Sequence, residues 1–311
     1  MDTLLYLVAR AFMTVLQALP LAWVVRVGRA AGALAWRLDA RHRQVALHNL
    51  ELCFGAEKLP QELRAIAQEN FRRIGENFAS AVRLAAMSDA EIQSVLTVKH
   101  ADRVVAFNPD AGHRTLVAAI GHFGNFELYA HIRLLLPGYT FAATYRGLRQ
   151  PGLNRLMQEL RAKSGCLFFE RREDMAALKA AMHRSNLMVG LLVDQHAGDR
   201  GARLPFFGHD CSTSVAPAVF ALRYHCPLVP AICYRTAPGR WCIEIGEEIP
   251  TRENGRPRST QAISAEMNRA FEVAIRRDPA NWFWVHNRWK PGRWRSDRAA
   301  NVDGRETKAP A

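Results

Sequence analysis

The chain has 311 residues, of which 49% are hydrophobic and 23% are charged. This composition is typical of a globular protein of one large or two modest domains, and it excludes the disordered, collagen-like and disulfide-scaffold classes. Lys and Arg number 42 against 29 Asp and Glu, which gives a formal net charge of +13 at pH 7. Such a basic excess indicates a polyanionic partner, which could be nucleic acid, anionic lipid or an acidic protein.

The N-terminal segment 3–25 is mostly apolar and is nearly long enough to span a bilayer. Its polar residues fall on one narrow stripe of a helix: Thr3, Arg10, Thr14 and Gln17. Pro20 is expected to end or kink this helix. The pattern fits an amphipathic helix in the membrane interface, a single span with its polar stripe against protein, or an ordinary core-packing helix. The arginines that follow favour contact with a membrane on its cytoplasmic face: Arg26, Arg29 and Arg37.

Residues 41–96 are charged and predict two helices separated near Leu59-Pro60. Short apolar runs then predict buried strands at 115–120, 139–145, 187–194, 227–234 and 241–245. Helices are predicted between and after them at about 125–136, 151–164, 173–184, 213–225 and 259–277. This alternation predicts an α/β fold with helices on both faces of a mixed, largely parallel central sheet. We expect a membrane-anchoring helical region at 1–40, one catalytic domain at 41–295 and a polar tail at 296–311.

The six cysteines occur at no C-x-x-C spacing, so neither a zinc site nor a redox motif is indicated. Scattered thiols in a chain of this length fit small buried residues in a reducing compartment. The sequence therefore predicts no metal site and no cofactor.

The most informative motif is GHFGNFE, residues 121–127, directly after the first predicted strand. His122 and Glu127 could not share one face of a continuous helix, but they can converge if His122 lies in the turn before it. Gly121 and Gly124 permit an unusual backbone there, and Asn125 is a plausible N-cap. A carboxylate bonded to one imidazole nitrogen leaves the other nitrogen free to act as a base. The motif therefore predicts a His122–Glu127 general-base pair.

The same motif resembles the first block of the lipid A biosynthesis (lauroyl/myristoyl) acyltransferase family, within the lysophospholipid acyltransferase superfamily. Later segments resemble that family's blocks in the same order: 144–165, ERREDMAALKA (170–180), VDQHAG (193–198), LPFFG (204–208) with Ser212-Thr213-Ser214, and NWFWVHNRWK (281–290). The resemblance covers nearly the whole chain and implies a glycerolphosphate acyltransferase-like fold.

The resemblance implies roles for individual residues. His122 would deprotonate a hydroxyl of the acceptor lipid, and Glu127 would orient His122. The resulting alkoxide would attack the thioester of an acyl donor, which is acyl carrier protein in most members and acyl-CoA in some. Backbone N–H groups near Gly124 and Asn125, or an arginine, would stabilise the oxyanion.

Further candidates come from the other blocks. Arg146 and Arg172 could bind phosphate bidentately, although solvated surface arginines are the alternative. Asp194 ends a predicted strand and could pair with Arg172, belong to the site or cap a loop. The FFG segment (Phe206, Phe207 and Gly208) could line an acyl-chain channel, or its rings could pack in the core. The departure at Gly147, where many members have proline, and at His196 puts substrate detail in doubt.

The resemblance thus implies a membrane-associated acyltransferase on the cytoplasmic face of a bacterial inner membrane. Its acceptor would be a phosphorylated glycolipid, such as a lipid A precursor, or another glycolipid such as a phosphatidylinositol mannoside. A nucleic-acid-binding protein is the alternative, because the tryptophans of the C-terminal segment are interleaved with arginines. That alternative accounts for neither the GHFGNFE motif nor the apolar N-terminus, so no nucleic acid partner is expected.

Overall fold

The computed structural model describes residues 2–105, 115–148, 150–171, 173–184 and 186–291, so the predicted polar tail at 296–311 lies outside it. The N-terminal helices are α1 (Asp2–Ala18), α2 (Leu21–Leu38), α3 (Ala40–Phe54), α4 (Pro60–Leu84) and α5 (Asp89–Val95). The central sheet consists of β1 (Leu96–Lys99), β2 (Leu116–Ile120), β3 (Thr140–Tyr145), β4 (Leu167–Glu170), β5 (Leu187–Leu192), β8 (Leu228–Ala237) and β9 (Arg240–Ile245).

Further helices connect and follow these strands: α6 (Asp102–Val105), the 3₁₀ helix η1 (Phe126–Leu134), α7 (Pro151–Ala162), α8 (Met175–Ala181), α9 (Ala216–Tyr224), α10 (Thr260–Arg277) and the 3₁₀ helix η2 (Pro279–Asn281). Two small hairpins complete the described chain: β6 (Ala202–Phe206) with β7 (His209–Thr213), and β10 (Arg252–Glu253) with β11 (Arg256–Pro257).

The predicted α/β fold with a mixed, largely parallel sheet is confirmed. The strand order is β1-β9-β8-β2-β5-β3-β4, and every neighbouring pair is parallel except β8 and β9. All five residues of β2 are buried, and they alternate between the two hydrophobic clusters on opposite faces of the sheet. Both faces are therefore covered, which explains why the strand is a continuous apolar run rather than an alternating one.

All five apolar runs of the sequence form strands, and the break near Leu59-Pro60 separates α3 from α4. The two edge strands β1 and β4 and the hairpins β6–β7 and β10–β11 were not predicted. Each residue of β4 is only partly buried, β6 has two buried residues among its five, and β7 begins with two exposed residues, so these segments give no strong apolar signal. The six cysteines are free, and all but Cys166 are buried, as predicted.

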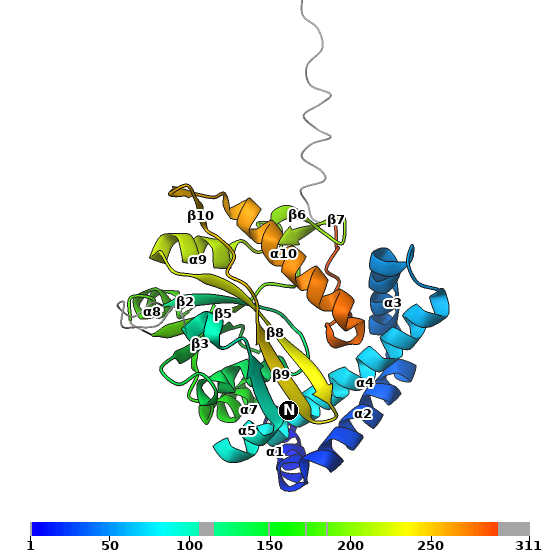
Figure 1. Cartoon of the computed structure of the whole chain (residues 1–311). Coiled ribbons are helices and arrows are strands. Elements are labelled where there is room, and N and C mark those ends of the chain that lie inside the picture. The colour runs from blue at the N-terminus through cyan, green and yellow to red at the C-terminus, as the bar shows by residue number, and fades with distance from the viewer. Residues whose placement is uncertain (1, 106–114, 149, 172, 185, 292–311) are drawn as a thin grey trace, which may run out of the picture.

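Helices α2 and α4 pack unusually closely along one side of the molecule (Figure 1). Three glycines make this possible, because a Cβ added at Gly32 would lie 2.1 Å from the carbonyl oxygen of Phe71, and one at Gly28 would lie 2.6 Å from that of Gly75. Such distances are far below normal contact, so larger side chains would force the helices apart. Gly28 faces residues 75–79 of α4 whereas Gly32 faces residues 71–72, so the two helices run antiparallel.

The helix pair is joined to the sheet through Glu76 of α4, whose side chain is completely buried. Its carboxylate accepts hydrogen bonds from Arg235 of β8 at 2.9 Å, from Arg29 of α2 at 3.2 Å and from the backbone N–H of Gly239 at 2.9 Å. A buried carboxylate is stable when such partners satisfy it, and losing one partner of a buried pair is strongly destabilising. Glu76 therefore fixes α2, α4 and β8 relative to one another.

Pro20 separates α1 from α2, as the sequence predicts. Across residues 2–105 and the other described ranges, no helix combines the length and the apolar character needed to cross a bilayer.

Candidate active site

His122 lies in the turn after β2, where the strand has just left the sheet. Two glycines shape this turn. A Cβ at Gly121 would lie 2.7 Å from the ring of Phe123 and 3.1 Å from the Asp194 carboxyl carbon. Gly124 has φ +49°, and a Cβ there would lie 2.6 Å from the carbonyl oxygen of Cys233. The sequence-based expectation of an unusual glycine-dependent backbone is confirmed.

The carboxylate bonded to His122 belongs to Asp194, two residues after the end of β5. His122 Nδ1 lies 2.8 Å from Asp194 Oδ1, and the backbone N–H of His122 donates to Oδ2 at 2.9 Å. The indole N–H of Trp282 also donates to Oδ2, at 2.8 Å. The position of Asp194 follows from the sheet, because Ile120 of β2 pairs with Leu192 of the parallel strand β5. The two strand ends therefore deliver His122 and Asp194 to the same edge.

The contacts of Asp194 decide which nitrogen of His122 carries a proton. Burial acts to raise the Asp194 pKa, but the facing His122 and the donated hydrogen bonds outweigh it, so the pKa is lowered overall. An ionised carboxylate only accepts hydrogen bonds, so Nδ1 of neutral His122 must be the donor. Nε2 therefore keeps its lone pair, and it lies 3.4 Å from the side-chain amide nitrogen of Gln195. This is the arrangement that a general base requires.

Glu127 does not make the contact with His122 that we expected from the motif. Its carboxylate accepts from Arg161 Nη2 at 2.7 Å and from Nε at 3.2 Å, and the described contacts include no hydrogen bond between Glu127 and His122. Residues 126–134 form a 3₁₀ helix that starts after Asn125, and this helix carries Glu127 toward α7, where Arg161 lies. The predicted His122–Glu127 pair is thus wrong as a hydrogen-bonded pair, and Asp194 occupies the partner position.

A cavity of about 670 Å³ opens beside His122 and is lined by residues of β2, η1, β3, α7 and the segment after β5. Among the described residues, its charged lining contains three arginines, Arg146, Arg161 and Arg171, and one carboxylate, Glu127. The Arg161 guanidinium lies 5.1 Å from the ring centre of Phe168 and 5.7 Å from that of Tyr145, so it is held flat against the wall. An excess of arginine in a concave site suits a phosphorylated ligand.

Two further histidines, His196 and His286, also line the cavity. His286 Nε2 accepts a hydrogen bond from the backbone N–H of His196 at 3.0 Å. Burial is the main cause that lowers the pKa of His286 to about 4, so its ring is neutral at pH 7. A neutral ring there leaves the positive charge of the cavity on its arginines.

The other candidate residues have mixed outcomes. Arg146 lines the cavity, whereas Arg172 lies outside the described residues. The backbone N–H of Gly124 is already used, because it donates to the carbonyl of Asn281 at 2.9 Å. Asn125 precedes η1 as predicted, but its side chain does not cap the helix, and its buried amide nitrogen has no hydrogen-bond partner.

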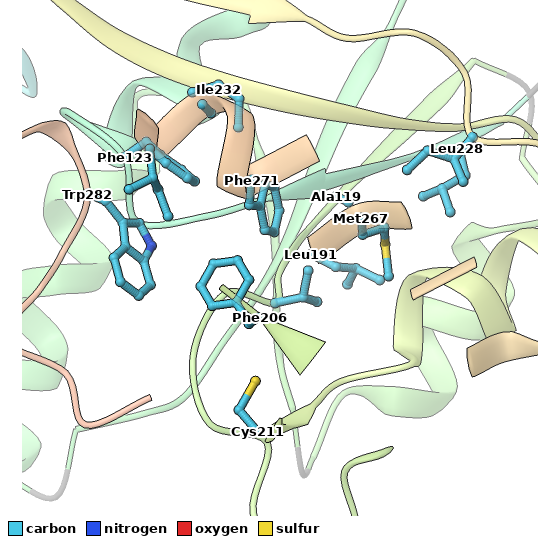
Figure 2. Close-up of a cluster of buried hydrophobic side chains, with 14 of the residues drawn as sticks. Ala119, Phe123, Leu191, Phe206, Cys211, Leu228, Ile232, Met267, Phe271 and Trp282 are labelled. Atoms are coloured by element: carbon cyan, nitrogen blue, oxygen red, sulfur yellow. The ribbon is translucent and has the colours of Figure 1, made fainter. Parts of the chain in front are cut away.

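The FFG segment contributes to the core rather than to the cavity. Phe206 is fully buried and Phe207 is 8% exposed, and Gly208 at φ +74° lies in the turn between β6 and β7. Figure 2 shows Phe206 among Phe271, Trp282 and Cys211 in the hydrophobic cluster. Of the two sequence-based interpretations, core packing holds for both rings, and neither lines the cavity beside His122.

Several residues of the C-terminal aromatic and basic segment are internal, whereas the part beyond residue 291 lies outside the described residues. Trp282 and Trp284 are almost completely buried, and Arg288 is fully buried, donating to the carbonyl of Gln195 at 2.9 Å and to Thr213 Oγ1 at 3.0 Å. These side chains are therefore not available to stack on nucleic-acid bases. His131, in the middle of η1, is also buried, at 9% exposure.

Four site residues were missed by sequence reasoning: Arg161, Arg171, Gln195 and His286. Arg161 closes the segment 144–165 and Gln195 follows Asp194 in VDQHAG, so both lay inside segments already singled out. What sequence could not supply was the side chain that each one faces. The parallel pairing of β2 with β5 was the signal that could have found the Asp194 contact.

Comparison with known proteins identifies the family of the chain. A family model described as bacterial lipid A biosynthesis acyltransferase matches residues 2–291. The chain belongs to this family. It is therefore an acyltransferase of lipid A biosynthesis, as the sequence blocks implied.

Individual relatives are distant but are matched over most of their length. The chain is 26% identical over 278 residues to the lipid A biosynthesis palmitoleoyltransferase of Escherichia coli K12, covering 85% of this chain and 84% of that one. It is 25% identical over 278 residues to the lipid A biosynthesis lauroyltransferase of the same strain, covering 88% and 87%. A lipid A biosynthesis acyltransferase of Haemophilus influenzae is 26% identical over 281 residues, covering 88% and 86%.

Proposed function

We propose that this enzyme transfers a fatty acyl chain from an acyl thioester to a hydroxyl of a phosphorylated glycolipid, a lipid A precursor. The donor is acyl carrier protein or CoA carrying the chain. The observation that carries this proposal is the His122–Asp194 pair, at 2.8 Å, on the wall of an arginine-lined cavity. Relatives named for palmitoleoyl and lauroyl transfer support a fatty acyl group as the cargo.

The reaction begins when His122 Nε2 takes the proton of the acceptor hydroxyl. The oxygen attacks the thioester carbonyl carbon, a C–O bond forms, and the tetrahedral intermediate collapses as the C–S bond breaks. The thiolate leaves and takes the proton back from the imidazolium, so the products are an ester and a free thiol and His122 is regenerated. Asp194 holds Nδ1 and stabilises the transient positive charge, and the Gln195 amide beside Nε2 is positioned to donate to the oxyanion.

The arginine-lined cavity supplies the recognition of phosphate. Arg146, Arg161 and Arg171 lie on its wall, and Glu127 neutralises part of the charge of Arg161. A guanidinium group binds phosphate oxygens through two parallel hydrogen bonds. This cavity therefore suits the acceptor's phosphates or the donor's phosphopantetheine phosphate.

An in vitro transfer assay tests the proposal. The purified enzyme is offered acyl carrier protein and CoA thioesters with lipid A precursors, their dephosphorylated forms and a phosphatidylinositol mannoside, and products are identified by mass spectrometry. We expect a new ester on the phosphorylated precursor and a raised KM for the dephosphorylated one. Transfer to the mannoside alone would mean that the acceptor is that glycolipid and not a lipid A precursor. Absence of transfer from every thioester would refute the proposal.

We further propose that residues 1–40 anchor the domain at 41–295 to the cytoplasmic face of the inner membrane. Large apolar side chains are exposed on α1 and α2: Leu5, Leu7, Val8, Phe12, Val15, Trp23, Val27, Leu34 and Leu38. Leu5, Val8, Phe12 and Val15 follow helical spacing and share one face of α1. The guanidinium of Arg26 lies 5.2 Å from the ring of Trp23, a pairing suited to lipid headgroups.

Membrane association is tested by changing the charge of this face. The double substitution Phe12→Glu and Val15→Glu is expected to release the protein from sedimenting vesicles that contain anionic lipid. The reason is that two carboxylates replace apolar side chains that the proposed contact buries in the membrane. Thr14→Glu is the matched control, since it adds a carboxylate to the same helix away from the apolar face. Equal sedimentation of both proteins would contradict membrane binding through α1.

A further inference from the structure

The peptide unit between Gln195 and His196 is held at both ends by side chains from the C-terminal part of the described chain. Its carbonyl accepts a hydrogen bond from Arg288 Nη1 at 2.9 Å, and its N–H donates to His286 Nε2 at 3.0 Å. The side-chain amide nitrogen of the same Gln195 lies 3.4 Å from His122 Nε2. His286 is therefore held next to the residue that contacts the proposed base.

The contact with His196 fixes the position of the proton on His286. A backbone N–H only donates, so Nε2 of His286 must be the acceptor and carries no proton. Burial is the main cause that lowers the pKa of His286 to about 4, so the ring is neutral at pH 7 and its one proton lies on Nδ1. Among the described residues, no side chain or carbonyl accepts this proton. The Nδ1–H group is thus a hydrogen-bond donor without a protein partner.

His286 and His122 line the same cavity. The charges of His122 and Asp194 act on the pKa of His286 in opposite directions, the first lowering it and the second raising it. The low pKa makes His286 a poor base, so it does not compete with His122 for the proton of the acceptor hydroxyl. It remains able to donate a hydrogen bond, as does the neutral histidine with which triosephosphate isomerase polarises a carbonyl. The two histidines therefore suit different roles in one reaction.

The tetrahedral intermediate of acyl transfer needs donors aimed at the oxygen that becomes negative. The backbone N–H of Gly124, which the sequence suggested for this purpose, already donates to the carbonyl of Asn281 at 2.9 Å. The amide of Gln195 is one remaining donor beside His122. The Nδ1–H of His286 is a second, and it is joined to the first through a single peptide unit.

We propose that His286 is a catalytic residue whose Nδ1–H donates a hydrogen bond to the oxyanion of the tetrahedral intermediate, beside the amide of Gln195. This inference rests on the proposed acyl transfer. The proton stays on His286 throughout: the carbonyl oxygen takes the negative charge as the C–O bond forms and gives it up as the C–S bond breaks. Because the charge exists only in this interval, the hydrogen bond lowers the barrier more than it strengthens substrate binding.

The test removes the Nδ1 proton and leaves Nε2 in place. Nδ1-methylhistidine at position 286 keeps the acceptor for the His196 N–H and replaces the donor with a methyl group. His286→Phe removes both groups without adding bulk at Nδ1, whereas His286→Gln supplies an amide that can accept and donate. The matched control is Nδ1-methylhistidine at position 183, because His183 is exposed and lies outside the cavity lining. Each protein is assayed for kcat, KM and thermal unfolding with one donor–acceptor pair.

We expect kcat to fall about 10²–10³-fold in the methylhistidine and phenylalanine proteins, the usual effect of losing one oxyanion donor, with KM little changed. The glutamine protein should lose less, and the control should match the wild type. A methylhistidine protein with normal unfolding and wild-type kcat would overturn the proposal, since its contact with His196 is intact and a purely structural role would be preserved. A loss confined to KM would overturn it too, because it would assign His286 to ground-state binding. Absence of transfer by the wild-type protein is a different result, since it refutes the acyl transfer itself.

Discussion

Replacing His122 with alanine is expected to lower kcat for acyl transfer by about 10²–10⁴-fold, the usual contribution of a positioned general base. The residual rate comes from binding and orientation of the two substrates, which this change leaves in place. KM for donor and acceptor should change little, because the imidazole acts on the hydroxyl proton rather than on either phosphate. The measurement is kcat and KM with one donor–acceptor pair at fixed pH.

The control for this prediction is a measurement that the His122→Ala protein is still folded. The His122 side chain is partly exposed and packs on Phe126 and Phe283 at the cavity wall, so its loss should leave the thermal unfolding of the protein nearly unchanged. An alanine variant that unfolds normally and transfers acyl groups at the wild-type rate would remove His122 from the chemistry.

The second large effect is expected from Asp194→Asn, which changes a single atom of the site. Both the backbone N–H of His122 and the indole N–H of Trp282 donate to Oδ2, so the amide oxygen of asparagine must take that place. Its NH₂ group then faces His122 Nδ1, which can only accept. The imidazole proton is forced onto Nε2, and the base is lost. The same exchange in serine proteases lowers kcat by about 10⁴, and a loss of that order is expected here.

The matched variant is Glu127→Gln, which weakens the pair with Arg161 and leaves the His122 tautomer untouched. Its effect should appear in the KM of the phosphorylated substrate and should be much smaller in kcat. Nitrogen NMR of the His122 ring gives a direct readout, with the proton on Nδ1 in the Glu127→Gln protein and on Nε2 in Asp194→Asn. Equal losses of kcat in the two variants, with no change of tautomer, would restore Glu127 as the partner.

The lowered pKa of Asp194 also affects how the stability of the folded enzyme depends on pH. Its folded pKa is lower than the value of about 3.9 for an unfolded aspartate, so its contribution to stability is present above that unfolded value. The contribution is lost only as pH falls through the lower folded pKa. Between pH 7 and about pH 4 the carboxylate stays charged, and activity lost in that interval has another origin.

The sequence predicted the strands and the position of His122 well, because buried parallel strands are continuous apolar runs and a glycine-flanked histidine at a strand end is a local pattern. It failed on the carboxylate partner for a physical reason. Glu127 is five positions from His122, whereas Asp194 is brought beside it by the pairing of β2 with β5, and a single sequence does not display that pairing. The segment VDQHAG was recognised, but the contact it makes was not.

The burial of Arg288 and His131 is a further feature that local sequence does not indicate. Charged and titratable residues are usually exposed. Arg288 is instead buried because the carbonyl of Gln195 and the hydroxyl of Thr213 accept its protons, and it fixes the segment after β5 to the β6–β7 hairpin. Such compensation depends on residues more than 70 positions away, which local composition cannot reveal.

The Glu76 ion pairs affect how the active site is positioned relative to a lipid surface. They connect α2, which exposes apolar side chains, to β8, the strand beside β2, and so hold this helix in a fixed position relative to the strand that carries the reacting imidazole. Any planar surface on which α1 and α2 rest then lies at a constant height and tilt relative to Nε2. On the membrane association proposed above, the reach of a lipid hydroxyl out of that surface would select which oxygen is acylated.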